Sequence, residues 1–205
     1  MHHSLFVEDF GIRMRPVRMD DAPFIVWLRN QEYVRGKVGD SAADIASQES
    51  WLESYFQREG DYYFIIETTC CIPVGTYGIY DVKDREGESG RWIVRPMVPA
   101  AIPSVILAFN VAFGWLQLDR LRVHTVSTNH RVLSLNRRLG FQQTKVHTAS
   151  QIIDGKAVDM VQFELRAKDW PKHRERILPL ARRAEEEIRN WEQSAAPGVW
   201  QSSVQ

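Results

Sequence analysis

Cysteine is nearly absent from this sequence: Cys70 and Cys71 are the only two among 205 residues, and they are adjacent. Adjacent cysteines cannot form an ordinary structural disulfide with each other, and two sulfur atoms cannot supply the four ligands of a structural metal site. We therefore expect no bound metal and a reducing, cytoplasmic location. A catalytic thiol is conceivable, but packing and turn formation at the edge of a strand are the commoner roles of such a pair.

The chain also lacks net charge, since 26 Lys and Arg residues balance 26 Asp and Glu residues. No overall field would concentrate such a chain on nucleic acid or on an anionic membrane, so we expect neither as a partner. No window reaches the roughly 18 apolar residues of a spanning helix. The opening MHHSLFVEDF has no basic segment followed by a long apolar one, which again favours the cytoplasm.

The length and composition favour one folded domain. A chain of 205 residues with 44% hydrophobic and 25% charged residues can bury a sizeable core. We expect this domain over residues 1–167, followed by a helical extension and a frayed tail over residues 168–205. Apolar residues recur in the extension at spacings of three and four, and Pro179 would kink it or start a second segment. This stripe would pack on the core, which we prefer, or on a second copy in a homodimer.

Hydrophobic periodicity predicts a mixed order of strands and helices. The predicted strands cover residues 11–17, 62–67, 74–82, 88–94, 121–127, 141–150 and 158–166. The predicted helices lie around residues 24–28 and 45–56 and cover residues 105–118 and 129–139. Asp20 or Asp21 could cap the first helix, and Gly140 would end the last because it tolerates positive φ. A polar link at residues 36–44 and a turn at Asp154 and Gly155 join elements.

Three local signatures occur in this order. They are ESGRWIVRP at residues 88–96, the apolar helix at residues 105–118 followed by LDRLRVHTV, and NHRVLSLNRRLGF at residues 129–141. Together they resemble the GNAT (GCN5-related N-acetyltransferase) superfamily over residues 12–164. The resemblance implies an α/β (α+β) fold: a mixed, mostly antiparallel sheet of six to seven strands, flanked by about four helices.

The resemblance also implies an enzyme that transfers an acetyl group from acetyl-CoA to a primary amine. The amine would attack the thioester in a V-shaped gap between the strands at residues 88–94 and 121–127, where main-chain N–H groups polarise the carbonyl. Glu88 matches the acidic position of the family and is the first candidate base. His124 is the second, because a neutral imidazole suits this task near pH 7. A surface charge and a structural histidine are the respective alternatives.

Cofactor contacts follow from the same resemblance, because helix starts attract phosphates. The expected contacts are Val94, Arg95, Ala100, Ala101, Ser104, Asn129, Arg131 and Asn136. Two features depart from the family. Asn136 stands where many members have a tyrosine that protonates the leaving thiolate, and an amide can only hydrogen-bond. The loop at residues 99–104 lacks the family's glycines, and its two prolines have no N–H.

Three functions stay open at this point. The glycine-poor loop is similar to GNAT-like proteins of surface-polysaccharide pathways, which favours an amino sugar or nucleotide-linked amino sugar as the acceptor. The early helices and the Glu88 strand also resemble ribosomal-protein N-terminal acetyltransferases. An acidic, open groove would favour a protein N-terminus, whereas a closed pocket with Trp51, Tyr77 or Trp92 would favour the sugar. A catalytically silent module that binds acyl-CoA or a partner protein is the third alternative.

Overall fold

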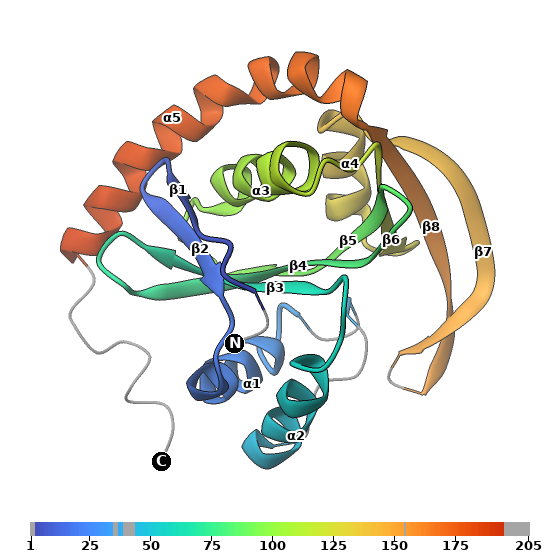
Figure 1. The fold of residues 1–205 in the computed structure, drawn as a ribbon, viewed down its shortest axis with the longest axis horizontal. Coiled ribbons are helices and arrows are strands. Elements are labelled where there is room, and N and C mark those ends of the chain that lie inside the picture. Colours follow the sequence, from blue (N-terminus) through green and yellow to red (C-terminus); the bar gives the residue numbers. More distant parts are fainter. Residues whose placement is uncertain (1–2, 35–36, 39–43, 154, 195–205) are drawn as a thin grey trace.

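A computed structural model describes residues 3–34, 37–38, 44–153 and 155–194. Most of the predicted link at residues 36–44, Asp154 of the predicted turn, and the tail after residue 194 lie outside these ranges. One sheet of eight strands runs through the molecule, with helices on both faces (Figure 1). The predicted mixed, mostly antiparallel sheet is thus confirmed, with slightly more strands than expected.

The strands lie in the order β1-β2-β3-β4-β5-β6-β8-β7, and all neighbours are antiparallel except β5 and β6. Sequence periodicity missed β1, because three residues are too few to show alternation. The strands are β1 (Val7–Asp9), β2 (Ile12–Pro16), β3 (Tyr62–Thr68), β4 (Pro73–Lys83), β5 (Glu86–Val94), β6 (Arg120–Val126), β7 (Gln142–Ile153) and β8 (Lys156–Arg166).

Five α-helices flank this sheet in the described part of the chain. None of these helices is long and apolar enough to cross a membrane. The helix predicted at residues 105–118 begins earlier and changes after residue 110 into a π-helical turn, Val111–Trp115. An apolar run gives no signal for its own ends, and Pro103 is tolerated in a first turn. The helices are α1 (Ala22–Arg29), α2 (Ile45–Tyr55), α3 (Ala101–Asn110), α4 (His130–Arg138) and α5 (Trp170–Ser194).

The central strands of the sheet are buried on both faces, because successive side chains of a strand point to opposite sides and helices cover each side. On β3, Phe64 and Ile66 belong to the core under α3 and α5, whereas Tyr63 and Ile65 belong to the core under α1 and α2. Figure 1 shows these helix pairs on opposite sides of the sheet. The central strands are therefore fixed from both sides, and the functional residues can depend on their positions.

Helix α5 covers the core of its own chain. Ile177, Ala181, Ala184 and Ile188 are buried, and the helix lies along α3. This is the arrangement that we preferred for the apolar stripe. Pro179 starts no second segment: the helix continues through it, with Pro179 on the exposed side, where its missing N–H leaves no buried carbonyl without a partner.

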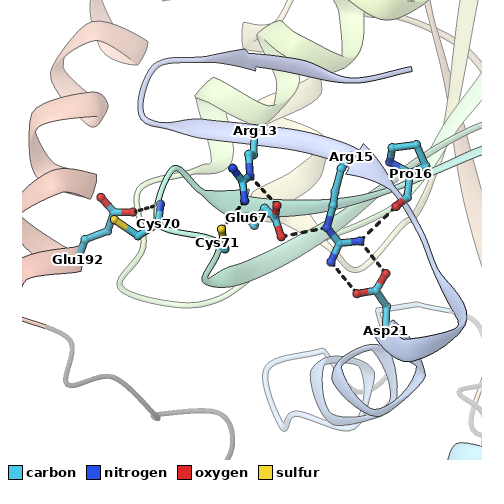
Figure 2. Close-up of polar contacts among 8 residues, drawn as sticks. All are labelled: Arg13, Arg15, Pro16, Asp21, Glu67, Cys70, Cys71 and Glu192. Atoms are coloured by element: carbon cyan, nitrogen blue, oxygen red, sulfur yellow. Dashed lines mark hydrogen bonds and ion pairs between the residues drawn. The ribbon is translucent and has the colours of Figure 1, made fainter. Parts of the chain in front are cut away.

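A charge cluster joins β2, β3 and the start of α1 (Figure 2). The buried carboxylate of Glu67 accepts hydrogen bonds from Arg13 Nε (2.5 Å) and Arg15 Nε (3.0 Å). Arg15 also donates two hydrogen bonds to Asp21, at 2.7 and 2.8 Å. The predicted cap is therefore wrong in its role, because Asp21 occupies the N-cap position of α1 but its side chain binds Arg15 and the main chain of Arg18 instead.

The two cysteines lie in the exposed turn between β3 and β4. Cys71 Sγ accepts a hydrogen bond from Arg13 Nη2 (2.6 Å), and the Cys70 N–H donates to Glu192 of α5 (3.0 Å), as Figure 2 shows. The turn thus connects the sheet to the end of α5.

We expect Glu67→Gln to lower the free energy of unfolding by about 3 kcal/mol, because it leaves the partly buried guanidinium of Arg13 without its counter-charge and that of Arg15 with Asp21 alone. Urea unfolding monitored by circular dichroism measures this change. The control is Glu185→Gln, which removes an exposed pair with Arg189 within α5 and should cost less than about 0.5 kcal/mol. Equal losses in the two variants would contradict the structural role of Glu67.

Candidate active site

The site lies where β5 and β6 separate. These parallel strands pair only from Glu86↔Arg120 to Glu88↔Arg122, and no pairing continues beyond. Strand β5 also carries a bulge against β4, at which Arg91 adopts a φ of 48°. Bulges bend a strand and often occur beside functional sites. A cleft of about 1360 Å³ follows the separated strands and extends between the α1–α2 side and α4.

The two candidate bases meet in this cleft, beside the last pairing of β5 with β6. Glu88 Oε1 lies 3.0 Å from His124 Nδ1, and the hydroxyl of Tyr80 donates a hydrogen bond to the same oxygen at 2.9 Å. On the other side of the imidazole, His124 Nε2 lies 3.3 Å from Gln162 Oε1. The sequence predicted each residue separately, and the structure brings them into direct contact.

The hydrogen bonds around Gln162 indicate the protonation state of His124. The Gln162 amide nitrogen donates to Glu164 at 3.1 Å, and a carboxylate can only accept, so the amide oxygen faces His124. That oxygen requires a proton on His124 Nε2, and Glu88 requires one on Nδ1. We infer that His124 is an imidazolium ion paired with an ionised Glu88.

The pKa values of both groups agree with an ion pair. Burial raises the pKa of Glu88, but the hydrogen bond and charge of His124, with help from Tyr80 and Arg122, outweigh burial and place it below its ordinary value. The hydrogen bond to Glu88 raises the pKa of His124 above its ordinary value, against the effect of burial. Each group therefore stabilises the charged form of the other.

The cleft is basic although the chain as a whole is neutral. Glu88 is the only Asp or Glu among the described residues that line it. Asp61, nearby, neutralises part of the charge by binding Arg91 at 2.5 and 2.9 Å and Arg58 at 3.7 Å. An excess of positive charge remains, which favours anions in the cleft. The lining Lys and Arg residues are Arg29, Lys37, Arg58, Arg91, Arg95 and Arg131.

Five of the expected cofactor contacts line the cleft: Val94, Arg95, Ala101, Asn129 and Arg131. Asn129 caps α4, since its side-chain oxygen accepts a hydrogen bond from the N–H of Val132 at 3.4 Å. Ala101 begins α3, where Ala101 and Ile102 have main-chain N–H groups that the helix itself does not need, whereas Pro103 has none. The starts of α3 and α4 therefore offer donors for phosphates, even though the loop at residues 99–104 lacks the family's glycines.

Three other expected contacts are buried in the walls and do not line the cleft. Ala100 is fully buried, and the hydroxyl of Ser104 accepts a hydrogen bond from the Trp92 indole at 3.1 Å. Asn136, also expected at the catalytic centre, donates from its amide to the Thr125 hydroxyl at 3.1 Å and so joins α4 to β6. Ser104 and Asn136 thus bind residues that line the cleft, Trp92 and Thr125, and do not line it themselves.

Sequence reasoning missed Tyr80, Gln162 and His147. Tyr80 lies opposite Glu88 on β4, and Gln162 lies opposite His124 on β8. His147 on β7 lies 2.9 Å from the same Gln162 oxygen. Register between distant strands places these residues, and a single sequence carries no signal for it. Within the described ranges, no three His, Cys, Asp or Glu side chains are grouped to hold a metal ion.

Comparisons with known proteins identify the family and the fold. The family model of the acetyltransferase (GNAT) domain matches residues 12–142. A GCN5-related N-acetyltransferase from Brucella melitensis has a similar structure, with a TM-score of 0.73 and 16% identity over 84% of this chain and 83% of that one. No curated protein sequence matches the chain.

Two further structures are similar. The apo form of FdhC, a nucleotide-linked sugar GNAT, has a TM-score of 0.70 and 24% identity over 88% of this chain and 98% of that one. A mutant of the spermidine N-acetyltransferase SpeG from Vibrio cholerae has a TM-score of 0.70 and 16% identity over 79% of this chain and 97% of that one. At these identities the likeness concerns the fold alone.

The pair predicts a pH window of stability. His124 has a raised pKa, so its contribution is complete below its ordinary value of 6.5 and is lost as pH rises through the folded-state pKa. Glu88 has a lowered pKa, so its contribution is complete above 4.5 and is lost as pH falls through the folded-state pKa. The stability difference between the wild type and Glu88→Gln should therefore be largest between pH 4.5 and 6.5.

Urea unfolding of both proteins from pH 4 to pH 9 measures this difference. Glu187→Gln, an exposed change of the same kind on α5, serves as the control and should show a small difference without this window. A difference for Glu88→Gln that stays constant across the range would contradict the ion pair.

Proposed function

Since the chain belongs to the GNAT acetyltransferase family, we propose that it transfers the acetyl group of acetyl-CoA to a primary amine in the cleft between β5 and β6. The contact between Glu88 and His124 is the observation that carries this proposal. It places a titratable pair where β5 and β6 separate, in a cleft that also reaches the starts of α3 and α4, where main-chain N–H groups suit phosphates. A catalytically silent module would have no need of such a pair.

Acetyl-CoA, when bound, supplies a thioester carbonyl, and an amine can attack it only after losing a proton. His124 can take that proton once it is neutral, directly or through a water molecule. Glu88 then keeps the remaining proton on Nδ1 and stabilises the cation that forms at proton uptake. The new C–N bond would form as the thioester C–S bond breaks, and the CoA thiolate would leave and take a proton from solvent, because the amide of Asn136 cannot supply one. The contact of 3.3 Å between Nε2 and Gln162 is long, so an amine or a water molecule can replace it.

The charge of the cleft supports an acceptor that carries negative charge. A polyamine such as spermidine would meet the lining Lys and Arg residues with its own positive charges. An amino sugar linked to a nucleotide brings phosphates, which suit these residues. FdhC is described as a nucleotide-linked sugar GNAT, which makes this acceptor class the first choice.

The expected aromatic residues support the same choice in part. Trp51 and Trp92 line the cleft, whereas Tyr77 lies in the core and binds Ser89 through its hydroxyl at 2.7 Å. A protein N-terminus remains the alternative acceptor, but the acidic groove that would favour it is replaced by a basic one.

We expect acetyl-CoA to raise the melting temperature of the protein, and we expect thiol release to be fastest with nucleotide-linked amino sugars. The panel contains these compounds, free glucosamine, spermidine and short peptides with a free N-terminus. Each is compared by kcat/KM. The absence of any thermal shift with acetyl-CoA would overturn the proposal that the protein is an acetyltransferase. A preference for spermidine would overturn the proposal that the acceptor is an anion.

Glu88→Gln should lower kcat at neutral pH by about 10- to 100-fold and leave the Kd for acetyl-CoA nearly unchanged. His124→Gln should lower kcat by about 100-fold or more, as expected for loss of a general base. The wild-type kcat/KM should rise with pH through the raised pKa of His124. In Glu88→Gln this rise of kcat/KM should occur at lower pH, because the carboxylate that raises the pKa of His124 is gone.

Initial rates from pH 5 to pH 9 give these profiles, with Glu187→Gln as the control that should keep the wild-type profile. If turnover in Glu88→Gln equals that of the wild type at every pH, the pair plays no part in proton transfer. If the rise of kcat/KM with pH disappears in Glu88→Gln instead of moving to lower pH, Glu88 itself is the base.

A further inference from the structure

Arg95 lies directly after β5, held between two indole rings. Its guanidinium carbon is 5.1 Å from the ring of Trp27 on α1 and 5.6 Å from the ring of Trp191 on α5. Such contacts stabilise a guanidinium group and fix its plane while leaving its N–H edge free for hydrogen bonds. Two distant segments of the chain thus hold one cationic side chain in place.

This guanidinium has no counter-charge within the described part of the chain. Arg95 Nη1 is buried without a hydrogen-bond partner, and no carboxylate affects its ionisation. Burial lowers the pKa of Arg95, because no carboxylate of the described residues offsets the loss of solvent around it. Arg91, by contrast, has Asp61 as its partner. A buried N–H without an acceptor is unfavourable, so an anion from outside would stabilise this position.

The hydroxyl of Tyr33 is a second donor without a partner. It is buried, lines the same cleft as Arg95, and forms no hydrogen bond with any described residue. Burial raises the pKa of Tyr33, and the positive charge of Arg95 opposes this rise, so the two groups lie within electrostatic range of each other. A neutral phenol and a guanidinium together offer several N–H and O–H donors to one anion.

The direction of Arg95 separates it from the helix starts that suit the cofactor. Along β5, Trp92 and Val94 pack toward the core under α3 and α5, whereas Ile93 packs toward α1 and α2. Arg95 continues the alternation of Ile93 and reaches Trp27 of α1. Figure 1 shows α1 and α3 on opposite sides of the sheet, and Ala101 begins α3.

We propose that Arg95 and Tyr33 form an anion subsite for the acceptor, which binds phosphoryl or carboxylate oxygens of the group that carries the amine. This inference rests on the proposed function and names where the charge of that acceptor is recognised. It assigns Arg95 to the acceptor, in place of the cofactor contact that the sequence suggested. Arg131, at the start of α4, stays with the cofactor.

The test uses uridine diphosphate as the probe, titrated by calorimetry into protein saturated with CoA, so that the cofactor site is filled. Arg95→Gln should weaken binding of the probe by about 10- to 100-fold, as for loss of a charge-assisted hydrogen bond, and Tyr33→Phe by less. The Kd for CoA, measured separately, should change less than twofold. Arg131→Gln should show the reverse pattern, and Arg183→Gln, exposed on α5, should change neither.

Arg95→Lys keeps the charge and checks that any loss is not due to misfolding, with melting temperatures recorded for every variant. Weaker CoA binding in Arg95→Gln with unchanged binding of the probe would overturn the proposal. No binding of the probe to the wild type at millimolar concentration would also overturn it.

A kinetic comparison separates this subsite from the proposed function. Glucosamine 6-phosphate and glucosamine differ only by the anion, and Arg95→Gln should raise KM for the phosphorylated amine alone. An equal rise for both amines would refute the subsite while the acetyltransferase stands. Arg95-dependent binding of the probe without acetylation of any amine would refute the proposed function while the subsite stands.

Discussion

The separation of β5 and β6 after Glu88 and Arg122 is the constraint on which the rest of the site depends. Up to that point the two strands pair, so Glu88 and His124 come from neighbouring backbones and can reach each other at 3.0 Å. Beyond it, main-chain groups that a sheet would normally satisfy become available to a ligand. The same geometric event thus brings the titratable pair together and opens the space in which it can act.

Several polar contacts hold this opening in a fixed shape. Arg91, at the bulge of β5, is bound to Asp61 and lies over the ring of Tyr80, which in turn binds Glu88. Gln162 on β8 orients His124 from the opposite wall. Because each of these residues contacts the next, the position of the carboxylate is set by both walls. A rigid, pre-oriented pair loses little entropy when substrates bind.

Element types were largely predictable from the sequence, because alternation and helical spacing are local properties. The sequence also suggested Glu88 and His124 as candidates, but their contact was not predictable, since it depends on the register between separate strands. Asn136 and Ser104 show the limit for helices. Leu135, directly before Asn136, and Ala101, one turn before Ser104, line the cleft instead. A small rotation of a helix about its axis decides which of its residues face the cleft. The charge of the cleft was equally hidden behind the neutral composition.

Helix α5 places Trp191 against Arg95, at the edge of the cleft, although the helix otherwise covers the opposite face of the sheet. Its last turns are also tied to the β3–β4 turn through Glu192. The C-terminal helix therefore supports a residue of the cleft wall, although none of its own described residues lines the cleft. A shortened form that stops after β8 would uncover the apolar core under α5 and would also leave the Arg95 guanidinium without the ring of Trp191, so domain trimming for crystallisation or fusion would disturb both the core and this edge of the cleft.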